Sequence, residues 1–506
     1  MSAEHRATLE HALRWIENSD VYKTIERNLD TIVRLPRNCM QERTLTTLFD
    51  VRKMGLLSSD EDIVSWCNMY EVEEERQEGD RIRPLAEPLI NDIIKAHAHT
   101  ETASQLHSST KYTSKDVTRR GVLHNDAGCQ FDYAAWFDQI PLDESIRKYF
   151  GVSKHIALFV LPMGFCPSCE VAEALTEAIA DTTIPVTTST CVDNVLFQGT
   201  STNLQAAGEI FLQRCSAVGA VVKSPTILIT DSYDYCGEHY SHSTKTRCLT
   251  AKTARKCQYA ASILANNKAV TLRQLMAIIG LGLYAANTLR IAVGTYHNAM
   301  RCYARAAAHC STGLSLDKPF ALPPGSRREL QMWLQRAAHN VPVPVFIDGE
   351  PEYTIYTDAS AAGWGALCIN KDGTMKTISC RWTTSALVGG NVQSSVYTEP
   401  LAARLAIAKF VPKGTKKVLV FTDHLPLVYS TKKTFGRAES YSQLSAFLEA
   451  YGADFVFEHI SGLINPADCL SRHVGEPPIL EVTKIGERDV RGLLMGVVDG
   501  QGWAFG

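Results

Sequence analysis

Four acidic residues in the last third of the chain stand where chemistry on phosphate esters would need them. Asp358 follows the apolar run TIYT, Asp423 follows KVLVFT, Glu399 lies near the start of a helical segment, and Asp468 lies in NPADCLSR. Acids at strand ends and helix starts can converge on one sheet edge, where their like charge costs stability unless divalent cations neutralise it. Two Mg²⁺ ions about 3.5 to 4 Å apart would then clamp the attacking and leaving oxygens of a phosphodiester. Each acid alone is also consistent with a turn residue or a helix cap.

The elements that must position these acids have the pattern of a mixed α/β domain. TIYTDAS, GWGALCINKDG and MKTISCRW read as three strands joined by hairpin turns. A helix over residues 398–410, the strand KVLVFTD, a helix near Ser442 and the strand FVFEHIS follow. This order predicts an α/β (α+β) domain with a mixed five-stranded sheet over residues 352–475.

The strings YTDASAAGWGA, TEPLAARLA, VFTDH and HISGLINPADCLSR together resemble the ribonuclease H domain of retroelements. The resemblance implies that Asp358, Glu399, Asp423 and Asp468 are the four metal-ligating carboxylates. It implies cleavage of the RNA strand of an RNA–DNA hybrid, leaving a 3′-hydroxyl and a 5′-phosphate. It also places His459 where several retroviral-type domains have a mobile histidine that assists turnover, although a surface histidine at a strand end is the alternative.

An upstream segment resembles a polymerase active site. FDYAAWFDQIPL at residues 131–142 looks like motif A of reverse transcriptases, in which an aspartate at the end of a strand holds both catalytic Mg²⁺ ions. That residue is Asp132. By the same resemblance, Phe137 lies beneath the sugar of the incoming nucleotide, where contact with a 2′-hydroxyl would exclude ribonucleotides. A phenylalanine of the hydrophobic core is the alternative.

Further segments match the next motifs of the same family in order. LPMGFCPS resembles motif B, in which Met163 and Gly164 would support the template base and the nucleotide. CVDNVLF resembles motif C, a hairpin that normally carries two adjacent aspartates. Here they are Asp193 and Asn194, and the amide brings no charge, so the affinity for Mg²⁺ should fall. Lys223 lies where motif D has a lysine thought to protonate the leaving pyrophosphate.

Basic residues near these motifs are candidates for contacts with phosphates. Arg81 and Arg83 match the fingers strand of the family, where paired donors grasp a triphosphate. The segment KTRCLTAKTARK has five basic residues and no acidic one, and would neutralise duplex phosphates independently of sequence. In both places a solvated surface is the alternative. The five are Lys245, Arg247, Lys252, Arg255 and Lys256.

Length and composition limit the class of protein. A chain of 506 residues, 45% hydrophobic and 21% charged, exceeds one domain and is neither collagen-like nor largely disordered. Lys plus Arg number 51 against 54 Asp plus Glu, so a nucleic acid must be met by local patches. Fifteen cysteines without regular spacing read as reduced thiols, which favours a cytoplasmic or nuclear location. No secretory signal or membrane-spanning run is visible.

The order of the segments predicts a right-hand polymerase followed by a ribonuclease H-like domain. We expect a helical N-terminal extension at 1–75, fingers and palm at 76–243, thumb and connection at 244–315, a linker at 316–351, the ribonuclease H-like domain at 352–475 and a tail at 476–506.

We therefore expect an RNA-directed DNA polymerase with ribonuclease H activity, most like tyrosine-recombinase retrotransposons of the DIRS and VIPER type. It would use two Mg²⁺ ions per active site, with Mn²⁺ as a substitute. Its partners would be an RNA template, a DNA primer, the RNA–DNA hybrid and deoxynucleoside triphosphates, and no membrane. Two alternatives stay open. One is a host-adopted scaffold that binds nucleic acid with a silent polymerase site, which Asn194 favours, and the other is a ribonuclease H alone.

Overall fold

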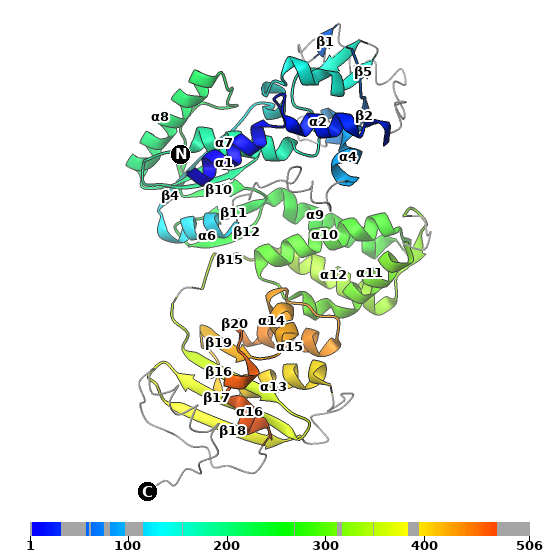
Figure 1. The fold of residues 1–506 in the computed structure, drawn as a ribbon. Helices are drawn as coiled ribbons and strands as arrows, with labels where there is room; N and C mark the ends of the chain where they lie inside the picture. The colour runs from blue at the N-terminus through cyan, green and yellow to red at the C-terminus, as the bar shows by residue number, and fades with distance from the viewer. Residues whose placement is uncertain are drawn as a thin grey trace. The chain divides into compact units, whose positions relative to one another are not determined.

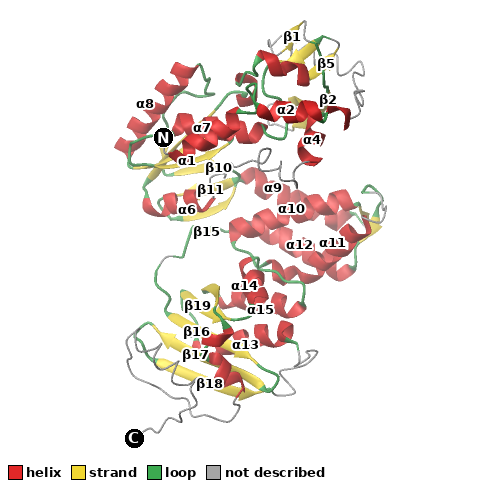
Figure 2. Ribbon diagram, viewed as in Figure 1, coloured by secondary structure: helices red, strands yellow, loops and turns green. Residues whose placement is uncertain are grey.

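The chain divides into two compact units, which are described separately. The computed structural model describes residues 3–31, 57–59, 62–74, 81–96, 115–153, 155–267, 269–310, 316–347, 349–382 and 394–472 (Figures 1 and 2). Unit 1 comprises residues 1–236 and 240–245, and unit 2 comprises 237–239 and 246–506. The division lies ahead of the proline-containing segment 316–351, where we expected the main boundary. No helix among these residues has both the length and the apolar character needed to cross a membrane.

Unit 1 mixes short helices with three small sheets. Their strand orders are β7-β8-β4-β9, β1-β6-β5 and β2-β3. The elements are α1 (Ala3–Leu13), α2 (Asp20–Arg27), η1 (Leu29–Thr31), β1 (Leu57–Ser59), β2 (Cys67–Glu74), β3 (Arg81–Pro88), α4 (Ile90–Ala96), α6 (Lys115–His124), β4 (Ala127–Asp132), η2 (Trp136–Gln139), η3 (Glu144–Tyr149), β5 (Gly151–Ser153), β6 (Ile156–Leu158), α7 (Ser168–Ala180), β7 (Thr187–Cys191), β8 (Asn194–Gly199), α8 (Ser201–Val218), β9 (Ile229–Thr230) and β10 (Ser232–Tyr235). The chain then passes between the units at β11 (Glu238–Ser241).

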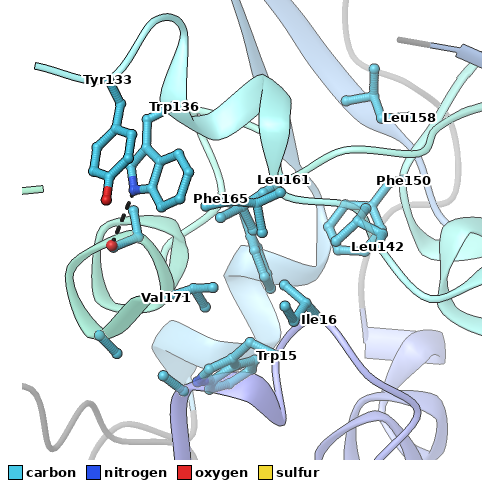
Figure 3. Packing of buried hydrophobic residues seen from close by; sticks show 14 of the residues in the cluster. Trp15, Ile16, Tyr133, Trp136, Leu142, Phe150, Leu158, Leu161, Phe165 and Val171 are labelled. Atoms are coloured by element: carbon cyan, nitrogen blue, oxygen red, sulfur yellow. Dashed lines mark hydrogen bonds between the residues drawn. The ribbon is translucent and has the colours of Figure 1, made fainter. Parts of the chain in front are cut away.

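The N-terminal helices belong to the core of unit 1 rather than forming a separate extension. Trp15, directly after α1, is fully buried, and its ring meets the Phe165 ring edge-on with centroids 5.9 Å apart (Figure 3). His11 Nε2 of α1 is 3.7 Å from Glu170 Oε1 of α7. Helix α1 therefore covers α7, which matters because α7 also carries the residues that hold a turn described below.

The acidic run before residue 75, which we read as helical, is a strand. Strand β2 pairs with β3 in an antiparallel hairpin, with Glu74 opposite Arg81. Charged residues have no strong preference for strands, so the pairing of two long strands, and not local propensity, decides the conformation here.

Unit 2 begins with a four-helix bundle. Its elements are β12 (Thr246–Leu249), α9 (Ala251–Asn266), β13 (Ala269–Val270), α10 (Leu272–Leu289), η4 (Val293–Tyr296), α11 (His297–Cys310), β14 (Phe320–Ala321), α12 (Pro324–His339) and β15 (Val343–Pro344). The expected linker at 316–351 thus contains a packed helix. Pro324 occupies the first turn of α12, where a proline starts a helix rather than breaking it. Trp333 of α12 is fully buried and stacks on Tyr296, with ring centroids 5.1 Å apart.

The C-terminal part of unit 2 is a five-stranded mixed sheet in the order β18-β17-β16-β19-β20. Strands β16, β19 and β20 run parallel, and β17 and β18 are antiparallel to their neighbours. Helices α13, α14, α15 and α16 flank it (Figures 1 and 2). The elements are β16 (Tyr353–Ala359), β17 (Gly363–Asn370), β18 (Met375–Arg381), α13 (Ser395–Phe410), β19 (Lys417–Thr422), α14 (Leu425–Lys432), α15 (Glu439–Tyr451), β20 (Asp454–His459), η6 (Gly462–Ile464) and α16 (Ala467–Arg472).

Within unit 2 the bundle is seated on α15 and the loop that precedes it. The backbone N–H of Gly294, in η4, donates to the Thr434 carbonyl at 2.7 Å. A Cβ at Gly294 would lie 2.8 Å from Ser445 Cβ, so only glycine fits there. Glu449 of α15 accepts from the Ala292 backbone N–H at 2.9 Å and from Thr295 Oγ1 at 3.0 Å. These hydrogen bonds, together with the close packing of Gly294 against Ser445, hold the bundle against α15 and the loop that precedes it.

Candidate functional site

Three carboxylates meet at one edge of the C-terminal sheet. Asp358 lies near the end of β16, Asp423 follows β19 directly, and Glu399 lies in the N-terminal part of α13. Strands β16 and β19 are parallel neighbours, so their carboxyl ends reach the same edge. Oxygen atoms of the three carboxylates all lie within 4.8 Å of one another. The structure therefore brings together three of the four acids that the sequence singled out.

Two of the three carboxylates, Asp358 and Glu399, are buried, Asp423 is half-buried, and the cluster has an unsatisfied oxygen. Burial raises the pKa of Asp358 to about 6, and the charges of Asp423 and Asp468 add to the rise. Glu399 is 4% exposed, and burial, followed by the charges of Asp358 and Asp423, raises its pKa well above the usual range. Its Oε1 accepts from the Ala359 backbone N–H at 3.2 Å, whereas its buried Oε2 has no partner among the described residues. Such a set of oxygens fits Mg²⁺ or Mn²⁺, because a divalent cation supplies the missing positive charge.

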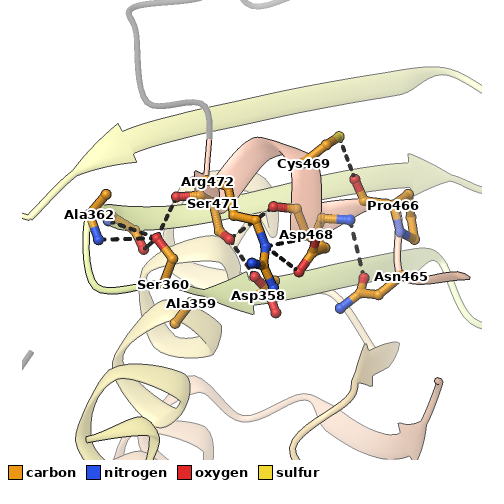
Figure 4. Close-up of polar contacts among 12 residues, drawn as sticks. Asp358, Ala359, Ser360, Ala362, Asn465, Pro466, Asp468, Cys469, Ser471 and Arg472 are labelled. Carbon is orange, nitrogen blue, oxygen red and sulfur yellow. Dashed lines mark hydrogen bonds and ion pairs between the residues drawn. The ribbon is translucent and has the colours of Figure 1, made fainter. Parts of the chain in front are cut away.

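Helix α16 carries the fourth acid and orients Asp358 (Figure 4). Both carboxylate oxygens of Asp468 accept from Arg472 Nε, at 2.8 and 2.9 Å. The buried Ser471 hydroxyl donates to Asp358 Oδ2, and the Ser471 carbonyl accepts from Ser360 Oγ at 2.7 Å. A metal ion at Asp468 would therefore have to compete with a guanidinium. Ser471 and Arg472 were not among the predicted site residues, although their spacing of three and four residues from Asp468 puts them on its side of a helix.

His459 lies at the same edge of the sheet as the acids. It ends β20, is exposed, and is paired with Thr422, the residue before Asp423. The loop after β20 passes close to the acids, since a Cβ at Gly462 would lie 2.8 Å from Asp423 Oδ2.

A second group of candidate residues meets at the ends of β4 and β8 in unit 1. Asp132 ends β4 and is paired with Asn194, the first residue of β8. Asp193 lies in the turn between β7 and β8, and its carbonyl accepts from the Tyr133 backbone N–H at 3.0 Å. Lys223 Nζ lies 2.5 Å from Asp132 Oδ2, and its backbone N–H donates to the Asp132 carbonyl at 2.8 Å. Residues from three separate segments are thus adjacent.

The second group contains two carboxylates that could bind a cation. Asn194 Nδ2 donates to Asp193 Oδ1 at 2.9 Å, so the amide now shields a carboxylate instead of adding a charge. Asp132 Oδ1 is buried and has no partner among the described residues. The Lys223 ammonium and the Asp132 carboxylate are about half exposed, and an ion pair of that kind contributes about 0 to 1 kcal/mol. A divalent ion could therefore displace the lysine, with two carboxylates as its ligands.

Gly164 makes a close approach to the backbone of β3. Its N–H donates to the Ala86 carbonyl at 3.1 Å, and a Cβ would lie 2.4 Å from that same oxygen. Asn91 Nδ2 donates to the Gly164 carbonyl at 2.9 Å. We expected the glycine to make room for a nucleotide, but in the structure it makes room for β3. The neighbouring Met163 is half-buried.

The other residues expected around a nucleotide lie in two elements. Phe137, in η2, is half-buried and packs against the core of unit 1. Arg81 and Arg83 lie on β3 opposite Glu74 and Val72 of β2.

The basic segment 245–256 separates into two groups. Lys252, Arg255 and Lys256 are exposed on α9. Arg247, expected to bind phosphates, is buried instead, and its guanidinium donates to the carbonyls of Asn287, Thr288 and Val345 at 2.8 to 3.2 Å.

Lys245 is also turned inward, toward the end of α6. Its Nζ donates to the Val122 and Asn125 carbonyls at 3.1 and 2.8 Å. Only the helical half of the segment therefore offers free basic side chains for phosphates.

Comparisons with known proteins give weak likenesses. No known protein family matches the chain, and no curated protein matches it. A foamy viral protease-reverse transcriptase in complex with double-stranded DNA aligns with 84% of this chain and 72% of its own, at 16% identity and a TM-score of 0.47. A foamy viral protease-reverse transcriptase in complex with an RNA/DNA hybrid aligns with 90% of this chain and 58% of its own, at 14% identity and a TM-score of 0.47. Likenesses at this level establish neither fold nor function, which rest on the residues described above.

Proposed function

We propose that residues 352–475 form a ribonuclease H-like domain that hydrolyses the RNA strand of an RNA–DNA hybrid. The observation that carries this proposal is the cluster of the buried Asp358 and Glu399 with the half-buried Asp423, in which a Glu399 oxygen has no partner among the described residues. These residues would hold Mg²⁺, which supplies positive charge to the attacking and leaving oxygens of a phosphodiester. Asp468 would join them once Arg472 releases it.

The remaining residues of this site have roles that follow from their contacts. The Ser471 hydroxyl holds one oxygen of Asp358 and so fixes the direction of the other. Burial of Glu399 keeps water from its carboxylate, which strengthens its interaction with a cation. The exposed His459 imidazole, at the same edge of the sheet, would have a role in turnover.

We propose in addition that the chain is an RNA-directed DNA polymerase with its catalytic site in unit 1. The observation that favours this second activity is the placement of Asp132 and Asp193 on adjoining ends of β4 and the β7–β8 turn, with Lys223 beside them. The two aspartates would hold Mg²⁺ where a primer 3′-hydroxyl attacks a nucleotide. Lys223 is placed to give a proton to the leaving pyrophosphate. The substrates would be deoxynucleoside triphosphates on an RNA template and a DNA primer.

This proposal assigns parts of the chain to a right-hand polymerase. Fingers and palm would occupy residues 76–243, with Arg81 and Arg83 toward the triphosphate and Phe137 and Met163 near the nucleotide. The thumb and connection would begin at 244 and include α12. Lys252, Arg255 and Lys256 of α9 would contact phosphates of the duplex. We further propose a retrotransposon of the DIRS and VIPER type as the source, and a cytoplasmic or nuclear location.

Primer extension and hybrid cleavage, measured side by side on the purified full chain, test the proposal. We expect both activities with Mg²⁺. Cleavage without extension in any metal would leave a ribonuclease H alone. Binding of nucleic acid with neither activity would favour the scaffold alternative. An Asp132→Ala variant is the matched control, and extension that persists in it would show that Asp132 is not the catalytic aspartate.

A further inference from the structure

The turn that carries Asp193 has a strained backbone. Strands β7 and β8 are joined through Val192 and Asp193, and Cys191 is paired with Asn194. Val192 has φ +56°, in the left-handed region. A β-branched residue there is a genuine outlier, and such strain persists only where the surroundings impose it. The contacts that impose it therefore decide where Asp193 points.

Both backbone groups of Val192 are held by side chains of one helix, α7. The Val192 N–H donates to Glu173 Oε2, and the Val192 carbonyl accepts from Thr176 Oγ1 at 2.6 Å. Glu173 Oε1 also accepts from the Thr190 hydroxyl of β7 at 2.7 Å. Glu173 and Thr176 are fully buried, and one helical turn separates them, so they face the turn together.

The same helix also holds the segment that follows Asp132. The Trp136 indole N–H donates to the Ala172 carbonyl of α7 at 3.2 Å (Figure 3). The Tyr133 ring stacks on the Trp136 ring, with centroids 4.0 Å apart. Ala172 and Glu173, which are neighbours in α7, are thus hydrogen-bonded to Trp136 and Val192. Trp136 follows the candidate metal-binding residue Asp132, and Val192 directly precedes the other, Asp193.

We infer that Glu173 and Thr176 are positioning residues for the polymerase site, which hold Val192 in its left-handed conformation and thereby set the place of Asp193 relative to Asp132. The inference rests on the polymerase activity proposed for unit 1. Glu173 acts as an acceptor of two hydrogen bonds and needs no charge for this. A glutamine can do the same, because its Oε1 can accept from Val192 while its Nε2 donates to the Thr190 oxygen.

Four variants of the full chain test this inference by primer extension over a range of Mg²⁺ concentrations. Glu173→Ala should lower kcat for extension by on the order of 10- to 100-fold and raise the Mg²⁺ needed for half-maximal rate. Glu173→Gln should extend nearly as the wild type does. Adding Val192→Gly to Glu173→Ala should recover much of the rate, because glycine adopts positive φ without strain. Glu177→Gln, one turn further along α7, is the matched control and should change nothing.

Hybrid cleavage by unit 2, measured on the same samples, should be unchanged and shows that unit 2 is intact in each variant. Wild-type extension by Glu173→Ala, or a failure of Val192→Gly to improve it, overturns the inference. Equal loss in Glu173→Gln and Glu173→Ala also overturns it, since that pattern belongs to a carboxylate that binds metal or moves a proton. If the wild type itself does not extend a primer, the polymerase proposal fails. Amide exchange over residues 187–199 then decides the inference, which requires faster exchange in Glu173→Ala than in Glu173→Gln.

Discussion

Asp423 shares its surroundings with two buried carboxylates, so in the metal-free protein its charge is a source of repulsion. Replacing it with an isosteric amide removes that repulsion together with a metal ligand. We predict that Asp423→Asn abolishes hybrid cleavage, leaves primer extension within about twofold of wild type, and raises the melting temperature measured in a chelator. Steady-state assays of both activities and thermal unfolding with EDTA check this. Retained cleavage would contradict the metal assignment.

The raised pKa of Asp358 gives stability a defined dependence on pH. Its pKa is about 6 in the folded chain against 3.8 ordinarily, so between these values the folded state holds more protons than the unfolded state. The contribution to stability of the metal-free protein therefore falls as pH rises through this window and stays low above it. Mg²⁺ should raise the melting temperature of unit 2 more at about pH 7.5 than at about pH 5. An equal shift at both pH values would contradict this, and Asp358→Asn is the control that should lose the dependence.

Asn194 distinguishes an active polymerase site from a silent one. Its amide donates to Asp193, and it is paired across the strands with Asp132. We predict that Asn194→Asp increases extension at low Mg²⁺ and reduces the preference for Mn²⁺, because a third carboxylate strengthens metal binding. Hybrid cleavage should not change. If extension is absent in every metal before and after the substitution while nucleic acid still binds, unit 1 is a scaffold.

At the scale of elements, the basic segment 245–256 shows that equal charges can have different roles. We predict that Lys252→Ala with Arg255→Ala reduces the slope of log affinity against log salt by about 2 and weakens binding equally across sequences, because both side chains are exposed on α9. Binding to template–primer at several salt concentrations measures the slope. An unchanged slope would show that these side chains only face solvent.

The contrasting substitution in the same segment is Arg247→Met. Its guanidinium satisfies carbonyls at the C-terminal end of α10 and the Val345 carbonyl. Removing it takes this donor from the carbonyls of the buried residues Thr288 and Val345, so we expect unit 2 to lose about 2 to 4 kcal/mol of stability while the salt slope per folded molecule stays the same. Denaturant unfolding of both variants separates the two effects.

The same elements show what could be read from the sequence. Acids placed directly after apolar strands can be assigned to a sheet edge, because parallel strands end together, and this located Asp358 and Asp423. A contact between residues far apart in the chain leaves no pattern in the sequence around either residue. Nothing in the residues around Glu173 shows that its carboxylate meets Val192, and nothing around Arg247 shows that it is buried. The segment 316–351 was expected to be a linker, because the sequence does not show whether a proline such as Pro324 lies inside a helix or at its first turn.

At the scale of the whole chain, the N-terminal helices are part of the core of unit 1. Trp15 is fully buried beside Phe165, which lies just before α7. We predict that Trp15→Ala destabilises unit 1 by about 3 to 5 kcal/mol and lowers the temperature at which extension is lost. The temperature at which cleavage is lost should not change, because unit 2 has its own core. A parallel loss of both activities would contradict this independence.

The close packing of Gly294 against α15 limits where such a chain can recombine during evolution. A nuclease that is joined to its neighbour by a loose tether can be exchanged between genes by a cut anywhere in that tether. Here Glu449 accepts hydrogen bonds from Ala292 and Thr295, and α15 packs so closely against Gly294 that no side chain would fit at that position. Recombination at residues 316–323 would separate α12 from the helices it packs against, and recombination at residues 340–351 would separate the bundle from α15. The viable unit of exchange is therefore the bundle and the sheet domain inherited together, with its breakpoint near residue 245.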